Sequence, residues 1–111
     1  MVHGVGAHSV KMTKFNVQNV ANPGLCVDCG YKHHGERFGL KECGWGGEQE
    51  MHLTWHQDIR PGRRSVCWDV SSGDPQAPVL LYNCHGMGGN QLWKYDPVSA
   101  SFVLKIRKIE F

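Results

Sequence analysis

The sequence of 111 residues lacks features that would place it in several common classes of protein. It has no run of about 20 apolar residues, which a membrane-spanning helix requires. Its net charge of +2 is too small to indicate binding to nucleic acid or to an anionic membrane. The segment 1–10 lacks the basic and apolar stretches of a secretory signal. We therefore expect no nucleic-acid partner, no membrane span and no signal peptide in this chain.

Motifs of catalysis are also missing. The sequence contains no nucleophile elbow, no phosphate-binding loop and no His-Glu-x-x-His pattern. It also has no convincing amphipathic helix. A chain of this length is expected to form one small domain that is not an enzyme by itself.

Glycine, tryptophan and cysteine are what the sequence does contain. Its 14 glycines and four tryptophans favour short strands joined by tight turns. Its five cysteines suggest a disulfide framework, which belongs in an oxidising compartment. Either a signal lies outside this chain, or the cysteines stay reduced.

An internal repeat of about 41 residues organises the chain. Two cysteine pairs share an interval of 17 residues, and the second pair follows the first by 41: Cys26 with Cys43, and Cys67 with Cys84. Each pair opens with a Cys-x-Asp motif and is followed by a Gln-x-large-apolar motif. The further matching residues are Asp28 with Asp69, Gln49 with Gln91, and Met51 with Trp93.

The repeat predicts an all-β fold of two complete units and the opening strand of a third. Short strands are expected at Ala77–Tyr82 and Ser101–Lys105, and a linker at Arg60–Arg64. A third Cys-x-Asp is due near residue 108, where the chain reads Lys108-Ile-Glu. The expected division is a flexible leader over 1–14, a first repeat over 15–62, a second repeat over 63–98 and a truncated third repeat over 99–111.

The motifs of the second unit resemble the ricin B-type lectin repeat. The segment Val79–Asp96 is similar to the C-terminal lectin domain of polypeptide N-acetylgalactosaminyltransferases, and Thr54–Gly62 resembles a connection in one subgroup of them. The resemblance covers about residues 15 to 98 and implies a β-trefoil in the secretory pathway or Golgi lumen. Gln-x-Trp is structural in that family. Manganese and UDP-GalNAc would belong to a catalytic domain that this chain does not contain, so we expect no cofactor here.

The resemblance also implies a site for galactose or N-acetylgalactosamine in the second unit, formed by Asp69, Tyr82, His85 and Asn90. The Asp69 carboxylate can accept hydrogen bonds from two sugar hydroxyls, and Asn90 can both donate and accept. His85 can hydrogen-bond through either ring nitrogen, and Tyr82 offers a ring face with a polar tip. The alternative is that Asp69 caps a turn and Tyr82 packs in a half-buried strand.

The first unit is not expected to bind sugar, because only its aspartate is kept. Lys41 stands where the second unit has Tyr82, and Gly44 where it has His85. Glu48, rather than an asparagine, precedes Gln49. Asp28 is therefore expected to be structural.

The repeat also predicts the disulfides Cys26–Cys43 and Cys67–Cys84, each of which would stabilise the fold by about 3 kcal/mol. Cys29 is left as a free thiol or as another partner for Cys43. A zinc site is the competing hypothesis, with ligands drawn from the nearby set Cys26, Cys29, His33, His34 and Cys43.

Three functions follow from these patterns. The first is a lectin module for galactose- or N-acetylgalactosamine-bearing glycans and glycopeptides, with the Gln-x-Trp residues and Trp68 in its core. The second is a fragment that binds nothing or associates with itself through its unclosed trefoil. The third is a small zinc-binding domain.

Overall fold

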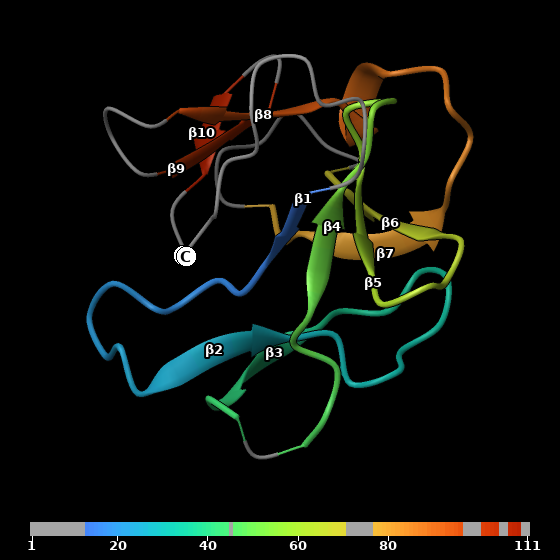
Figure 1. Cartoon of the computed structure of the whole chain (residues 1–111). Coiled ribbons are helices and arrows are strands. Elements are labelled where there is room, and N and C mark those ends of the chain that lie inside the picture. Colours follow the sequence, from blue (N-terminus) through green and yellow to red (C-terminus); the bar gives the residue numbers. More distant parts are fainter. Residues whose placement is uncertain (1–12, 45, 71–76, 97–100, 105–106, 110–111) are drawn as a thin grey trace.

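The regular structure of the described residues consists of short antiparallel strands and one turn of 3-10 helix, in agreement with the all-β class that the sequence predicts. The computed structural model describes residues 13–44, 46–70, 77–96, 101–104 and 107–109 (Figure 1). Within these ranges the strands are β1 (Thr13–Phe15), β2 (Leu25–Asp28), β3 (Gly39–Glu42), β4 (Met51–Leu53), β5 (Ile59–Pro61), β6 (Val66–Asp69), β7 (Leu80–Asn83), β8 (Trp93–Asp96), β9 (Ser101–Leu104) and β10 (Arg107–Ile109). One turn of 3-10 helix, η1, covers Gly89–Gln91. In this described part, no helix is long and apolar enough to cross a membrane.

The strands form two hairpins and two three-stranded sheets. The hairpins are β2–β3 and β6–β7, and the sheets have the orders β1–β4–β5 and β8–β9–β10. In the first hairpin Cys26 lies opposite Lys41, and in the second Cys67 lies opposite Tyr82. The two registers differ by the 41-residue shift seen in the sequence. The repeat is therefore a repeat of structure, and Lys41 does occupy the position of Tyr82.

Two sequence predictions about boundaries were wrong. Thr13 and Lys14, assigned to the leader, pair with Leu53 and His52 of β4; residues 1–12 lie outside the described part. The predicted linker Arg60–Arg64 begins inside β5, which pairs with β4 along its length. Arginine, proline and glycine suggested a loop, but the packing against β4 makes the first part of this segment a strand.

The order of the strands also changes where the second unit is taken to begin. Shifted by 42 residues, β5 falls on β9, which starts within the predicted opening strand of the third unit. Strands β1 and β5 both pair with β4, which follows the first hairpin, and β9 pairs with β8, which follows the second hairpin. This correspondence favours placing β5 at the start of the second unit. The predicted strand at 77–82 is shorter than expected and begins at Leu80.

The core joins the two units around two tryptophans. Trp68 of β6 and Trp93 of β8 are both buried, and their rings meet edge to face with centroids 5.9 Å apart. The Trp93 indole N–H donates to the Trp68 carbonyl oxygen over 3.0 Å. Phe38, which precedes β3 in the first unit, packs on Trp68. The other buried apolar residues of this core are Phe15, Val17, Val27, Cys29, Met51, Ile59, Val70 and Leu81.

The core positions expected from the Gln-x-Trp motifs are confirmed. Met51 and Trp93, which occupy matching positions in the two units, are both fully buried. Leu53 is partly buried against the same core.

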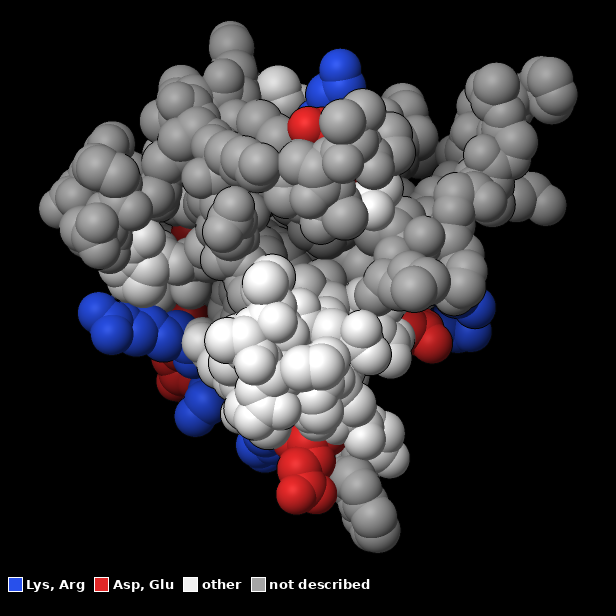
Figure 2. All heavy atoms as spheres, turned by 90° about the vertical axis from the view of Figure 1, so that its left-hand side faces the viewer, with Lys and Arg blue, Asp and Glu red and all other residues white. Residues whose placement is uncertain are grey.

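One face of the molecule is uncharged at its centre. Figure 2 shows uncharged side chains in the middle of this face and charged side chains of both signs at its margins. The face lies on the side of the β1–β2 connection, and the chain from Phe15 to Leu25 contains no charged residue. The described surface in this view thus shows mixed charges rather than a continuous basic area.

Candidate functional site

The β6–β7 hairpin places Asp69 and Tyr82 on the same face. Asp69 lies opposite Leu80, two residues before Tyr82. Residues opposite each other share a face, as do residues two apart on one strand, so Asp69 and Tyr82 are diagonal neighbours about 7–8 Å apart. The other face carries Trp68 and Leu81, both fully buried in the core.

The side chain of Gln91 fixes Asp69 in place. Its amide nitrogen donates to Asp69 Oδ2 over 2.9 Å and to the Asn83 carbonyl over 3.1 Å. Its amide oxygen accepts the His85 backbone N–H over 3.3 Å. Gln91, at the end of η1 and buried, therefore ties together β6, the end of β7 and the loop that follows.

Asn90 and His85 lie on the exposed loop between β7 and β8. The Asn90 carbonyl accepts the Val70 N–H over 3.2 Å, which brings Asn90 beside the end of β6 and Asp69. His85 Nδ1 accepts the Met87 N–H over 3.0 Å. A neutral His85 ring then carries its hydrogen on Nε2, which makes that atom a donor on an exposed side chain.

The second hairpin and the loop that follows it thus carry all four predicted residues, but at different places. Asp69 lies at the turn end of the hairpin, Tyr82 lies opposite Cys67 toward the other end, and His85 follows that other end. Asp69 and Asn90 are joined through adjacent backbone, and Tyr82 shares the face of Asp69. The hydrogen bond that the His85 side chain accepts from Met87 stays within its own loop. From the sequence, His34 was a candidate only as a zinc ligand. In the structure its ring lies against that of Tyr82, with centroids 4.5 Å apart. Since His34 belongs to the other unit, no spacing within a unit could have indicated this contact.

The first unit contains the same glutamine-centred arrangement. The Gln49 amide nitrogen donates to Asp28 Oδ2 over 3.2 Å and to the Glu42 carbonyl over 2.8 Å. Its amide oxygen accepts the Gly44 N–H over 3.0 Å. Each partner is matched in the second unit, so this cluster is a structural element of the repeat.

The aspartates of the two units differ in their second oxygen. Asp28 Oδ1 accepts the backbone N–H groups of Gly30 and Glu48, at 2.8 and 3.0 Å. For Asp69, the structure as far as it is described shows a single hydrogen-bond donor, Gln91, which uses Oδ2. Asp28 Oδ1 is therefore occupied by two donors, whereas Asp69 Oδ1 has no donor among the described residues.

The space in front of the two aspartates differs as well. A Cβ atom added to Gly47 would collide with the Asp28 carboxylate. Gly89 occupies the matching position of the second unit, and a Cβ added there would meet no described atom within 4 Å. Both glycines have positive φ. Among the described residues, Gly47 is thus packed against the aspartate of its unit whereas Gly89 is not, although both aspartate side chains are buried.

A partly buried ion pair lies next to this arrangement in the first unit. Glu48, at the position of Asn90, accepts two hydrogen bonds from the Arg64 guanidinium, each 2.6 Å long. It also accepts the Tyr31 N–H over 2.9 Å, and Arg64 donates to the Lys32 carbonyl over 2.7 Å. The hydrogen bond to Glu48 raises the pKa of Arg64 above its ordinary value. These bonds hold the loop after β2 against the loop before β4.

Both predicted disulfides, Cys26–Cys43 and Cys67–Cys84, are present, and Cys29 is the free cysteine. Burial raises the pKa of the Cys29 thiol to about 12. Its sulfur lies 3.8 Å from the Met51 sulfur. Because Cys26 and Cys43 are bonded to each other, they cannot serve as the zinc ligands of the competing hypothesis.

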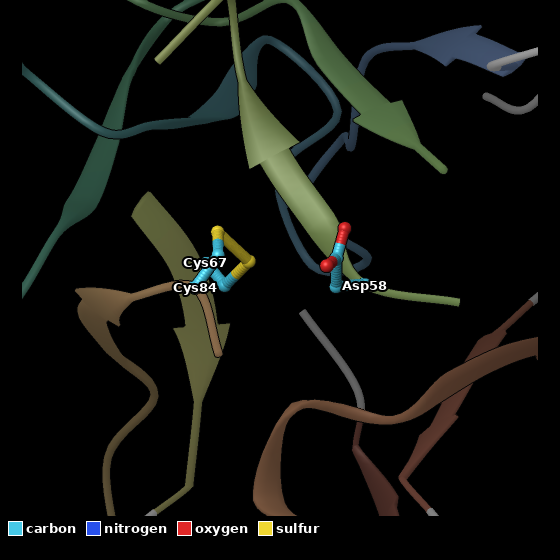
Figure 3. Close-up of side chains that lie close together, drawn as sticks. All are labelled: Asp58, Cys67 and Cys84. Atoms are coloured by element: carbon cyan, nitrogen blue, oxygen red, sulfur yellow. A yellow bond between two sulfur atoms is a disulfide. The ribbon is translucent and has the colours of Figure 1, made fainter. Parts of the chain in front are cut away.

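One group of potential metal ligands lies elsewhere in the described part. Asp58 lies near the Cys67–Cys84 disulfide, as Figure 3 shows. The two sulfurs are bonded to each other, and the Asp58 carboxylate accepts hydrogen bonds from Thr54 Oγ1 and Arg60 Nε at 2.6 and 2.9 Å. Asp58 is therefore part of the β4–β5 turn rather than a metal site.

Comparison with known proteins agrees with this architecture. Residues 13–107 match the model of the ricin-type beta-trefoil lectin domain. The chain is 47% identical over 85 residues to a putative polypeptide N-acetylgalactosaminyltransferase 10 of Caenorhabditis briggsae, with 71% of the chain and 13% of that protein covered. It is 41% identical over 86 residues to N-acetylgalactosaminyltransferase 6 of Drosophila melanogaster (72% and 13% covered). It is 39% identical over 103 residues to human polypeptide N-acetylgalactosaminyltransferase 10 (77% and 17% covered). The matched region is thus a small part of each relative.

Proposed function

Because the chain belongs to the ricin-type β-trefoil lectin domain family, we propose that it binds N-acetylgalactosamine or galactose through its second unit. Asp69 would accept hydrogen bonds from two neighbouring sugar hydroxyls, and Asn90 would donate and accept beside it. Tyr82 would stack on the apolar face of the sugar. His85 would donate from Nε2.

The contrast between the two aspartates carries this proposal. Asp28 and Asp69 are held by the same glutamine cluster, but Asp28 Oδ1 is occupied by two backbone N–H groups. Asp69 is also buried, with 7% of its surface exposed, but among the described residues its Oδ1 has no donor and a Cβ placed on Gly89 would meet no atom within 4 Å. A carboxylate held rigid on one oxygen and available on the other suits recognition of hydroxyl groups, because its orientation is fixed before the ligand arrives.

The relatives suggest the kind of ligand and the compartment. They are named N-acetylgalactosaminyltransferases, and the names of the Caenorhabditis briggsae and human proteins specify polypeptide. We therefore propose that the natural ligand is N-acetylgalactosamine attached to a glycopeptide. The two disulfides support a location in the secretory pathway, in the Golgi lumen by likeness to the relatives. Transfer of sugar is not assigned to this chain, which matches at most 17% of these relatives.

The proposal is tested by NMR titration of the chain with N-acetylgalactosamine, galactose and glucose. A shallow site buries little ligand area, so we expect a Kd of about 1 mM. Backbone signals of Asp69 and Asn90 and ring signals of Tyr82 should move with the first two sugars. Absence of these shifts at high concentrations of both sugars would refute the proposal.

The aspartates supply a matched pair of variants for this titration. Asp69→Asn keeps the size of the side chain and removes the charge that strengthens hydrogen bonds to hydroxyls, so it should weaken binding at least tenfold. Asp28→Asn makes the same change in the first unit and should leave the Kd unchanged, although it lowers stability. Equal Kd values for the two variants would contradict the assignment of the site to the second unit.

A further inference from the structure

The connection between β2 and β3 of the first unit runs along the outer edge of β7 in the second unit (Figure 1). The Gly35 N–H donates to the Leu81 carbonyl over 2.6 Å, and the Leu81 N–H donates to the Glu36 carbonyl over 3.0 Å. Arg37 and Leu80 form an isolated bridge next to these bonds. The strand that carries Tyr82 is therefore paired with β6 on one edge and with the first unit on the other.

His34 extends this pairing with its side chain. Its Nδ1 atom accepts the Asn83 N–H over 2.8 Å, two residues beyond the bond to Leu81. The first unit thus holds the backbone on both sides of Tyr82. Because Nδ1 accepts a hydrogen bond, a neutral His34 ring carries its hydrogen on Nε2.

The same imidazole also contacts the Tyr82 ring. The two ring planes are inclined by 78°, with centroids 4.5 Å apart, which is an edge-to-face arrangement. Such pairs are favourable beyond the area they bury. Tyr82 is half-buried and His34 is exposed, so the contact lies at the surface where a ligand approaches Tyr82.

We infer that His34 is a positioning residue for Tyr82, so that the sugar site of the second unit is completed by the first unit. This inference rests on the proposed function. The hydrogen bond to Asn83 fixes the imidazole, and the fixed imidazole limits the rotation of the Tyr82 ring. A ring that is already held in its binding orientation loses less conformational freedom when the sugar stacks on it.

The first test needs no sugar. In the NMR spectrum of the ligand-free chain, His34→Ala should shift the ring signals of Tyr82 and the amide signal of Asn83. His33→Ala is the matched control, because His33 joins the loop through its backbone N–H and carbonyl, and those bonds survive the substitution. It should leave both signals in place. Unchanged Tyr82 and Asn83 signals in His34→Ala would overturn the inference.

The second test measures binding of N-acetylgalactosamine by the same variants. His34→Ala should raise the Kd about three- to tenfold, the range expected for loss of an edge-to-face aromatic contact. His33→Ala should bind as the original chain does. His34→Phe keeps a ring beside Tyr82 without the hydrogen bond, and it should recover part of the lost affinity.

The outcomes separate this inference from the proposed function. If the unsubstituted chain does not bind the sugar, the proposed function fails while the sugar-free spectra still report on the contact. If it binds and His34→Ala binds equally well, the site stands and the role of His34 is refuted. If His34→Ala and His34→Phe lose the same affinity, ring packing is not the cause and the inference is likewise refuted.

Discussion

The two units of this protein share one framework of hydrogen bonds and differ in the groups that surround its aspartate. In both, a hairpin is closed by a disulfide, and a glutamine holds an aspartate at the hairpin's end. In the first unit two backbone N–H groups occupy Asp28 Oδ1, and Glu48, which donates one of them, is paired with Arg64. In the second, Asn90 replaces Glu48, and a Cβ placed on Gly89 would meet no described atom within 4 Å. The same framework thus surrounds its aspartate with different groups in the two units.

The largest expected effect concerns the shared framework at Trp93 and Met51. Trp93→Ala should destabilise the protein by about 3–5 kcal/mol, because it removes a buried ring that packs on Trp68 and donates a hydrogen bond. Met51→Ala should cost about 2–5 kcal/mol, nearer the lower value, since methionine has no such bond. Denaturant titration measures both. A larger loss for Met51→Ala would show that the first unit dominates the core.

The next largest loss of stability is expected at the two glutamines that hold the aspartates, and these variants also compare the two units in sugar binding. Gln91→Ala and Gln49→Ala each remove two donated hydrogen bonds, one to a buried carboxylate and one to a backbone carbonyl, so each should destabilise the protein by about 2–3 kcal/mol. Only Gln91→Ala should also weaken sugar binding, because only Asp69 is assigned to the site. Denaturant titration combined with sugar titration at low temperature measures the two losses. Loss of sugar binding in both variants would mean that the units are coupled.

The smallest effect concerns Cys29, whose counterpart in the second unit is Val70. Both side chains are fully buried, so Cys29→Val should change stability by less than about 1 kcal/mol. Because burial raises the pKa of the Cys29 thiol to about 12, the folded protein should resist alkylation at pH 8 and react only after unfolding. Mass spectrometry after iodoacetamide treatment measures this. Rapid labelling of the folded chain would contradict the buried position.

The sequence predicted those features of the site that arise within one unit. The spacing of the cysteines predicted both disulfides, and the Gln-x-Trp motif predicted the buried positions of Met51 and Trp93. The all-β class followed from the same repeat. These predictions succeeded because strand pairing and hairpin closure depend on residues close together in the chain.

Predictions at the edges of the units were less successful. Thr13 and Lys14 were assigned to a leader, and Arg60 and Pro61 to a linker, yet both pairs of residues lie in strands that pair with β4. Neither segment has a strong strand pattern of its own. Pairing with β4 supplies their backbone hydrogen bonds, and this overrides the weak local preference.

The sequence by itself determined the repeat, the cysteine pairing and the absence from the first unit of counterparts to Tyr82, His85 and Asn90. The tertiary structure decided that Glu48, whose backbone N–H caps Asp28, is paired with an arginine from beyond the first hairpin, and it alone brought His34 to Tyr82. The physical reason is the range of the contacts. Residues within a unit meet because the chain between them is short, whereas loops of different units meet only after the hairpins have packed around a common core.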